Sequence, residues 1–384
     1  MLKKFKKLQR IRSFGAPKER VTATIEQSNH GCVLNLGHRE VILDVHSFAA
    51  LRHDVFDFAV FAMAAISMSQ NIEIDAHFPV SESVAERLPE IKKVFGLWSV
   101  DTLAPLRLNL RNVVPSPSSV QAREIGIICL SGGLDSMSAA ISAVAQGGAS
   151  HALLIAGADY KTSKDIGFIE LKERVLSIAS RLGLELVVVE TNIRKVGIEW
   201  GMTHGLNLGF CLNYLSPIFE KGLFAQDFTA FQDGFVAPWG NFNALPTLLS
   251  TETFPIKTLG IDVDRVEKLR RVQQFDEQLL DDLTVCYADK KIGGNCGRCT
   301  KCTVTRAAFY AHGISDEHRF NQRADLVSAL GKLKKPKNFS QARVQMVRNS
   351  ELLAVLKDGA VKDAVNQYDA RVRAVYHRQA PGIG

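Results

Sequence analysis

The chain has 384 residues, 46% of them hydrophobic and 23% charged, which is the composition of a folded protein and excludes extended disorder. Its net charge of +7 arises in the first 18 residues, which hold seven basic side chains and no acidic one. The rest of the chain balances 40 basic against 40 acidic side chains, so we expect no nucleic-acid partner. No apolar run is long enough to span a membrane.

Residues 1–18 form a basic tail. Their apolar side chains recur at every third position from Leu2 to Phe14. In a helix, this spacing would give a basic amphipathic face for an anionic membrane surface or an acidic partner. A frayed, solubilising terminus is the alternative. The tail lacks the long apolar region of a secretory signal, so we expect a cytoplasmic protein.

Residues 19–120 are predicted to form an α+β accessory domain. Alternating residues over 20–45 predict a hairpin, and an apolar helical stretch follows over 48–68. The other elements expected here are a strand at 71–78, a helix at 81–95 and an extended segment at 106–114. The Pro- and Ser-rich stretch 115–124 then predicts a domain boundary near residue 120.

Residues 121–325 alternate short, continuously apolar strands with amphipathic helices. This order predicts an α/β fold built on a Rossmann-like parallel sheet. The expected strands are 125–130, 152–156 and 184–190, and the expected helices are 134–145, 164–182 and 204–219. Ligands of such sheets bind at the carboxyl ends of the strands. Residues 326–384 are predicted to add a helical C-terminal extension.

A glycine loop, "SGGLDS" from Ser131 to Ser136, joins the first of these strands to its helix. Gly132 and Gly133 leave no side chain between the backbone N–H groups and a ligand, and the helix start adds unpaired donors. The residues expected to bind nucleotide are therefore Ser131, Gly132, Gly133, Leu134, Asp135 and Ser136. Asp135 would repel a phosphate unless a metal ion lies between them, which predicts Mg²⁺. A capped strand-to-helix turn is the alternative, and no lysine-bearing phosphate loop occurs.

Four of the seven cysteines cluster in the sequence. They are Cys286, Cys296, Cys299 and Cys302. Gly297 permits a tight turn between the ligands, and four thiolates with no open position predict a structural zinc site. An iron–sulfur cluster, a sulfur-relay thiol and reduced cysteines without metal are the alternatives.

Two basic residues are expected at the start of another helix. Asp264 and Glu267 have the spacing of a capping box, which places Arg265 and Lys268 in the first turn. A cation is disfavoured at that end of a helix unless an anion is nearby. We therefore expect both residues to contact phosphate or carboxylate, with a solvated basic face as the alternative.

Further polar and aromatic residues are expected near the carboxyl ends of the strands. His204 is predicted at a helix start, where it would contact ribose or phosphate, unless it is a packed surface histidine. Trp239, Asn241 and Asn243 lie in a long loop and could form a pocket for a planar base. Simple packing of that loop is the alternative.

The glycine loop resembles the pyrophosphate loop of the ATP pyrophosphatase superfamily, whose members split ATP between its α and β phosphates. The resemblance implies that the loop holds the leaving pyrophosphate while a substrate oxygen attacks the α-phosphate. With the cysteine cluster, the chain looks most like the 7-cyano-7-deazaguanine synthase branch over Ile125–Ala308. It is similar to longer relatives of that synthase, several of them associated with anti-phage defence.

The resemblance implies ATP, Mg²⁺ and zinc as cofactors. We expect ATP-dependent adenylation of a carboxylate or amide oxygen on a deazapurine-like or related small acid, followed by attack of ammonia or an amine. A protein partner encoded in a defence operon would suit the longer relatives. The residues expected to take part in catalysis are Asp135, Ser136, Arg265 and Lys268. A tRNA-thiolating enzyme and a nucleotide-binding scaffold without turnover are the alternatives.

Overall fold

The computed structural model describes residues 14–45, 47–48, 51–98, 102–117, 124–286, 294–322 and 324–379. Most of the predicted basic tail lies outside the described residues. Within the described part of the chain, no helix is both long enough and apolar enough to cross a membrane.

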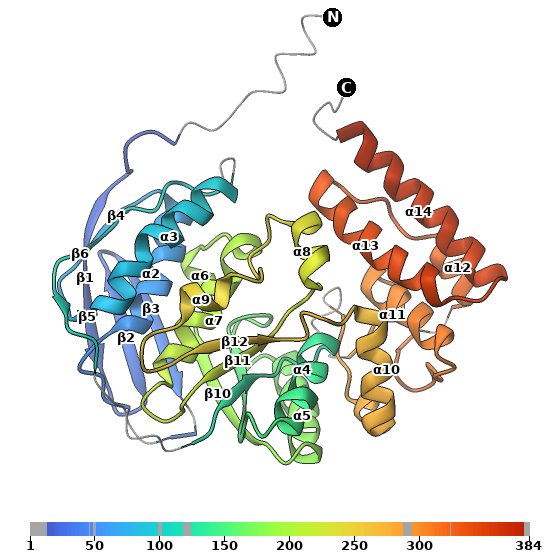
Figure 1. The fold of residues 1–384 in the computed structure, drawn as a ribbon, viewed down its shortest axis with the longest axis horizontal. Coiled ribbons are helices and arrows are strands. Elements are labelled where there is room, and N and C mark those ends of the chain that lie inside the picture. Colours follow the sequence, from blue (N-terminus) through green and yellow to red (C-terminus); the bar gives the residue numbers. More distant parts are fainter. Residues whose placement is uncertain are drawn as a thin grey trace, which may run out of the picture.

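A sheet of ten strands forms the centre of the protein (Figure 1). Its strands lie in the order β12-β11-β8-β9-β10-β3-β2-β1-β4-β6. The bounds are β1 Arg20–Gln27, β2 Gly31–Leu36, β3 Arg39–Val45, β4 Glu73–Ala76, β6 Leu108–Leu110, β8 Ile127–Cys129, β9 His151–Ala156, β10 Glu185–Thr191, β11 Gly222–Ala225 and β12 Ile256–Leu259. The short strands β5 (Val80–Ser81) and β7 (Val113–Val114) pair separately.

The five strands from β12 to β10 all pair in parallel. Numbered by their order in the chain, they lie in the sequence 3-2-1-4-5, which is the order of doubly wound sheets. The direction of winding reverses between β8 and β11, and such a reversal opens a crevice at the carboxyl ends of the two strands. The predicted α/β fold with a parallel sheet is therefore confirmed.

The N-terminal strands extend the same sheet. The hairpin predicted over 20–45 is partly right: β1 pairs antiparallel with β2, but the predicted second strand turns at Gly37 (φ +64°) and continues as β3, which pairs antiparallel with β2. β3 then pairs antiparallel with β10, with Val45 opposite Val189, so strands from both sides of residue 120 share one sheet. Whether 19–120 folds as a separate domain stays a prediction.

Helices cover both faces of the sheet, and each face has its own apolar core. Successive residues of β8 show the division, since Ile127 belongs to one core and Ile128 to the other. The first core includes α2 (Asp57–Gln70), α3 (Glu82–Trp98), α7 (Trp200–Tyr214) and α9 (Leu245–Leu249). The second includes α4 (Leu134–Ala145), α5 (Ile166–Arg181), α10 (Arg265–Asp276) and α11 (Thr300–Ala311). This alternation is expected for buried strands.

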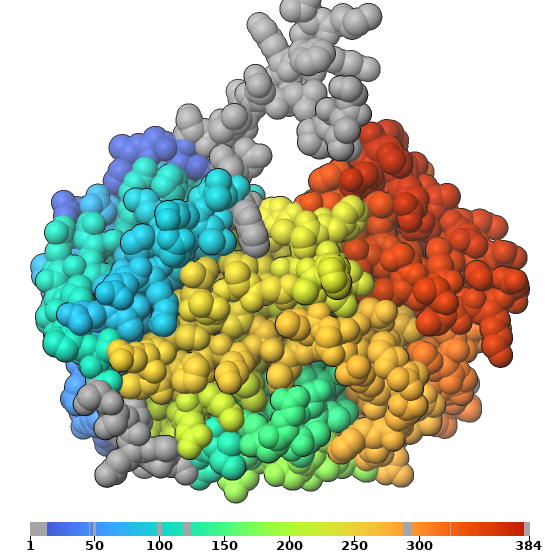
Figure 2. Space-filling view, in the orientation of Figure 1, coloured from blue at the N-terminus to red at the C-terminus, as the bar shows by residue number. Residues whose placement is uncertain are grey.

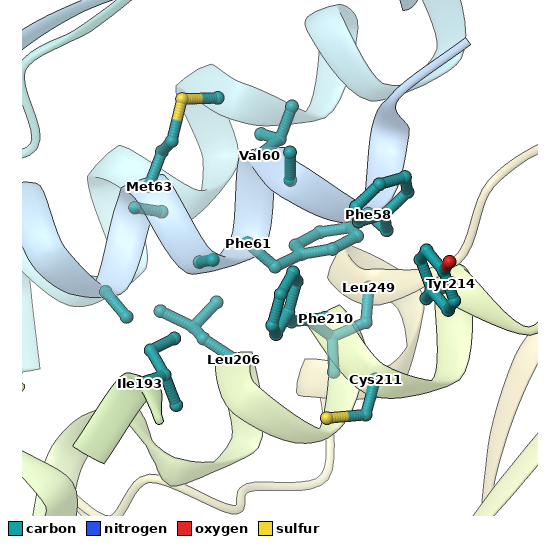
Figure 3. Close-up of a cluster of buried hydrophobic side chains, with 14 of the residues drawn as sticks. Phe58, Val60, Phe61, Met63, Ile193, Leu206, Phe210, Cys211, Tyr214 and Leu249 are labelled. Atoms are coloured by element: carbon teal, nitrogen blue, oxygen red, sulfur yellow. The ribbon is translucent and has the colours of Figure 1, made fainter. Parts of the chain in front are cut away.

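Aromatic side chains join the N-terminal region to the central sheet. Figure 3 shows Phe58 and Phe61 of α2 packed against Leu206 and Phe210 of α7. All four side chains are at most 1% exposed. The ring of Phe58 also meets that of Tyr214 edge-on, with 5.0 Å between centroids. The N-terminal part of the chain therefore packs against helix α7.

The C-terminal extension is helical, as predicted. It contains α12 (Leu326–Gly331), α13 (Phe339–Val355) and α14 (Ala360–Gln379). Figure 2 shows these helices packed against the middle of the chain, on the side away from the N-terminal strands. The remaining short elements are α6 (Ile193–Val196), α8 (Ala230–Val236) and a 3₁₀ helix at Glu277–Asp281.

Two helix starts differ from the prediction by four residues or more. The helix expected from residue 48 begins at Asp57. The helix expected from His204 begins at Trp200, because the Glu199 carboxylate accepts a hydrogen bond from the Met202 N–H and caps it there. His204 therefore lies within α7 and not at its start.

Candidate functional site

The glycine loop lies at the carboxyl end of β8 and leads into α4. Gly132 has φ +73°, a conformation that disfavours side chains. A Cβ there would also lie 3.2 Å and 3.3 Å from the side chains of Leu171 and Val175. The Gly132 carbonyl oxygen accepts a hydrogen bond of 2.8 Å from the Thr284 N–H. Glycine is therefore required here by both the backbone and the packing.

The Ser136 hydroxyl organises the loop. It donates to the Gly133 carbonyl oxygen at 2.9 Å and accepts from the Ser131 N–H at 3.2 Å. Helix α4 begins at Leu134, and its N-cap residue, Gly133, has no side chain to cap it. The loop is thus shaped by its own hydrogen bonds, while the helix start keeps N–H groups that can bind an anion.

Asp135 forms ion pairs with Arg265 and Lys268, the two basic residues predicted to contact phosphate or carboxylate. Its Oδ2 accepts from the Arg265 guanidinium, and its Oδ1 lies 3.2 Å from Lys268 Nζ. Lys268 is 1% exposed and also donates to the Gln226 carbonyl oxygen at 2.6 Å. Burial opposes ionisation of Asp135, but Arg265 and Lys268 together hold its pKa at about 2. The carboxylate is therefore charged and fixes the position of both cations.

These contacts do not fit a magnesium ligand at Asp135. Magnesium takes oxygen ligands with near-ideal octahedral geometry, but both carboxylate oxygens of Asp135 already face a cation. The arrangement instead places positive charge at the start of α4. We assign no step to magnesium.

A cavity of about 880 Å³ lies at the carboxyl ends of the parallel strands. Ser131 lines it after β8, Tyr160 after β9 and Asp227 after β11. The cavity thus occupies the crevice where the winding reverses. Its volume is in the range of small-molecule and cofactor sites. On its other side the C-terminal extension contributes residues from Lys334 to Tyr368.

Most of the charged side chains that line the cavity are basic. The basic side chains are Arg194, Lys301, Lys334, Lys335, Lys337 and Arg348, and the acidic ones are Asp159 and Asp227. Burial lowers the pKa of Lys301 to about 8. This excess of positive charge suits an anionic ligand such as a polyphosphate.

Aromatic rings form another wall of the cavity. The His204 ring lies 5.9 Å from Trp200 and 5.5 Å from Trp239, measured between centroids. Trp239 Nε1 donates to Asp227 at 2.9 Å, and the Arg194 guanidinium lies 4.8 Å from the Trp200 ring centre. His204 thus lies in an aromatic wall suited to a planar ring, and its Nδ1 is 3.1 Å from the Trp200 carbonyl oxygen.

The two asparagines expected to join Trp239 in a base pocket do not line this cavity. The Asn241 side chain donates to the Ala225 carbonyl oxygen at 3.0 Å. The Asn243 backbone N–H donates to the Asp233 carboxylate at 3.1 Å. Both residues hold the loop to neighbouring elements.

The four clustered cysteines converge on one point. Their sulfur atoms all lie within 4.8 Å of one another. The Sγ–Sγ distance is 3.8 Å for Cys286 and Cys299 and 3.9 Å for Cys296 and Cys302. A tetrahedral zinc ion with bonds near 2.3 Å would separate its sulfur ligands by about 3.8 Å. The group could therefore hold a metal ion such as zinc.

The backbone around the cysteines supports this arrangement. The Cys299 N–H donates to Cys296 Sγ at 3.4 Å, and the Cys302 N–H donates to Cys299 Sγ at 3.5 Å. Gly297 has φ +76°, and a Cβ there would lie 1.9 Å from the Gln322 carbonyl oxygen. The glycine expected to permit a tight turn is thus required.

The cysteine cluster is joined to the glycine loop. The segment before Cys286 reaches the loop through the Thr284–Gly132 hydrogen bond. Asn295, next to Cys296, accepts from the Val285 N–H at 2.8 Å and donates to a neighbouring carbonyl oxygen on the same segment. A metal held by the cysteines would therefore stiffen the segment that supports the loop. Asn295 gave no signal in the sequence, because an asparagine beside a cysteine is not distinctive.

The structure brings most of the predicted site residues together at the start of α4. The loop residues, Arg265 and Lys268 meet there, while Leu134 is buried in the apolar core. Sequence reasoning missed Lys301 and Arg348, because no local pattern connects them with the loop. A comparison with models of known protein families finds no match, and a search of curated proteins finds none either.

Proposed function

We propose that the protein binds ATP in the 880 Å³ cavity and cleaves it between the α and β phosphates to adenylate an acid. The observation that carries the proposal is the glycine loop beside an uncapped helix start, with Arg265 and Lys268 held next to it by Asp135. Ser131 of the loop lines the cavity, and backbone N–H groups with buried cations beside them are the groups that bind a polyphosphate.

In the proposed reaction, a carboxylate or amide oxygen of the acceptor attacks the α-phosphorus of ATP. The bond from that phosphorus to the bridging oxygen breaks, and pyrophosphate leaves with the electron pair. Ammonia or an amine then attacks the activated carbon and releases AMP. The loop N–H groups, Arg265 and Lys268 would stabilise the charge that grows on the leaving group.

The aromatic wall suits a planar heterocycle. ATP contains such a ring, and so would a deazapurine-like acceptor. Trp200, His204 and Trp239 would stack against it, and the lining cations would face its anionic groups. This combination supports a heterocyclic acid as the acceptor.

We propose zinc for the four cysteines, in a structural role. All four ligand positions are protein sulfurs, so no position remains for a substrate. The Sγ–Sγ distances match those expected around one ion, which also favours a single metal over a cluster of several iron atoms. Bound zinc would hold the loop-supporting segment in place.

Sulfur transfer, as in a thiolating enzyme, has less support. Outside the cluster, Cys129 lines the cavity, but burial raises its pKa to about 12, which disfavours the thiolate. The other cysteines outside the cluster, Cys32 and Cys211, are buried in the core. No specific observation favours a sulfur relay.

Product analysis with α-labelled ATP and candidate acids tests the proposal. Formation of AMP and pyrophosphate would support it, and formation of ADP would contradict it. Binding of ATP without turnover across the acids tested would favour the nucleotide-binding scaffold.

A matched pair of glycine variants connects the reaction to the loop. Gly132→Ala is expected to abolish turnover, because the Cβ would strain the backbone and press on two core side chains. Gly147→Ala is the control: Gly147 also has a positive φ, of +60°, but a Cβ there meets nothing within 4 Å. Equal loss of turnover in both variants would count against a specific role for the loop.

A further inference from the structure

We propose that Arg348, in helix α13 of the C-terminal extension, binds the pyrophosphate half of the nucleotide. This inference rests on the proposed function, because it assumes that ATP occupies the cavity. It goes further because it assigns a phosphate contact to the C-terminal extension, which contains neither the glycine loop nor the cysteine cluster. The extension would then complete the site.

The position of Arg348 supports this role. It lines the main cavity together with Ser131 of the glycine loop. It also lines a small adjoining hollow with Leu134, the first residue of α4, and with Arg265. Arg348 therefore lies at the end of the cavity where the loop and the helix start are found. A ligand phosphate bound by the loop would be close to this side chain.

The hydrogen bonding of Arg348 suits an anionic ligand. Its Nε is buried and has no hydrogen-bond acceptor among the described residues. Asp135 and Asp227 attract it electrostatically, but Asp135 already pairs with Arg265 and Lys268. A buried guanidinium N–H without an acceptor is costly, and a phosphate oxygen would satisfy it once the side chain turned toward the ligand.

Hydrogen bonds hold helix α13 in place, so that Arg348 keeps its position beside the cavity. The Glu351 carboxylate accepts from Gln232 of α8 at 2.7 Å, and Arg343 donates to the Phe235 carbonyl oxygen at 2.9 Å. On its other side, Asn349 donates to Asp369 of α14 at 3.1 Å. These contacts on either side of Arg348 fix the helix against the body of the protein.

Other lysines of the extension line the cavity but are less suited to this role. Lys334, Lys335 and Lys337 are exposed. Exposed cations are screened by solvent and salt. Arg348 also presents a planar fork that matches two phosphate oxygens, which a lysine cannot do.

Titration calorimetry of the full chain with inorganic pyrophosphate, and separately with α,β-methylene-ATP, tests the inference. Arg348→Gln is expected to weaken pyrophosphate binding by at least about tenfold, which corresponds to the loss of a charge-assisted hydrogen bond. Arg378→Gln, in the exposed last turn of α14, is the control and should bind as the wild type does.

The outcomes separate the inference from the proposed function. Unchanged pyrophosphate affinity in Arg348→Gln would overturn the inference alone. A wild-type protein that binds neither ligand would overturn the proposed function as well. If Arg348→Gln does not fold, Arg348→Lys takes its place: weaker binding is expected because the fork is lost, and unchanged binding would overturn the inference.

Discussion

The two ends of the chain relate to the cavity in different ways. The N-terminal strands lengthen the sheet from β10 outward, and no described residue before Cys129 lines the cavity. The C-terminal extension covers the carboxyl ends of the strands and lines the cavity with residues from Lys334 to Tyr368. Both ends lie outside the five parallel strands from β8 to β12, but only one of them reaches the candidate site.

The difference follows from the direction of the parallel strands. A strand added at the sheet edge buries apolar surface but lies far from the crevice between β8 and β11. Helices placed over the carboxyl ends must meet the ligand site. We therefore expect changes at the N-terminal end to alter stability, and changes at the C-terminal end to alter binding. Two predictions test this division, and a third tests how an ionisable group of the C-terminal extension affects stability.

The largest effect is expected from loss of the metal. Cys302→Ser removes one of the four cysteines proposed to hold zinc, and structural zinc contributes an apparent ~10–16 kcal/mol to the folding of small zinc domains. We expect loss of bound zinc and increased hydrogen exchange in α11 to α14, with β1 to β3 still protected. Metal analysis and hydrogen exchange measured by mass spectrometry check both.

The control for that variant is Cys32→Ala, which removes a buried cysteine outside the cluster. It should keep its zinc and its protection in α11 to α14. Equal loss of protection at both ends of the chain in Cys302→Ser would contradict the division, because the metal would then support the whole fold.

The next effect concerns the core between α2 and α7. Phe61→Ala is expected to lower the free energy of unfolding by about 3–5 kcal/mol, because it leaves a cavity in a fully buried cluster. The folded protein should bind α,β-methylene-ATP as the wild type does. Urea denaturation and calorimetry measure the two quantities.

Phe275→Ala is the matched surface control, since Phe275 is 51% exposed, and its stability should change by only about 0.5 kcal/mol. A large drop in affinity for Phe61→Ala, with little loss of stability, would show that the N-terminal region shapes the cavity after all.

A smaller effect is expected from Glu351, whose burial raises its pKa from 4.5 to about 7. The folded state then holds a proton that the unfolded state releases between these two values, so the free energy of unfolding should fall as pH rises through this window. The full change is about 3 kcal/mol. Gln232 and Arg265 lower the pKa of Glu351, and Asp264 raises it further.

Urea denaturation at pH 5 and pH 8 measures this effect. Glu351→Gln resembles the protonated side chain, so it should remove the pH dependence that Glu351 causes and be more stable than the wild type at pH 8. Glu252→Gln, at an exposed position, should keep the wild-type dependence. Identical pH profiles for Glu351→Gln and the wild type would contradict the assignment.

Local features of the site were predictable. Helix α4 spans the predicted 134–145, and the Asp264 side chain accepts from the Glu267 N–H at 2.8 Å as its spacing indicated. The cysteine spacing also predicted a cluster that the structure shows. These features depend on residues within a few positions of one another, and such short-range geometry is carried by the sequence pattern.

Long-range features were not predictable. The β3–β10 pairing joins Val45 to Val189, and no pattern in either strand specifies its partner. The start of α7 was misplaced because Glu199 is an unusual capping residue.

The sequence by itself determined the alternation of strands and helices, the glycine loop and the set of four cysteines, because each depends on periodicity or close spacing. Only the tertiary structure decided that Asp135 pairs with Arg265 and Lys268, and that Arg348 lines the cavity together with Ser131. Arg265 and Lys268 lie 130 and 133 positions from Asp135 in the chain, and their contacts arise from the way the sheet and the covering helices pack.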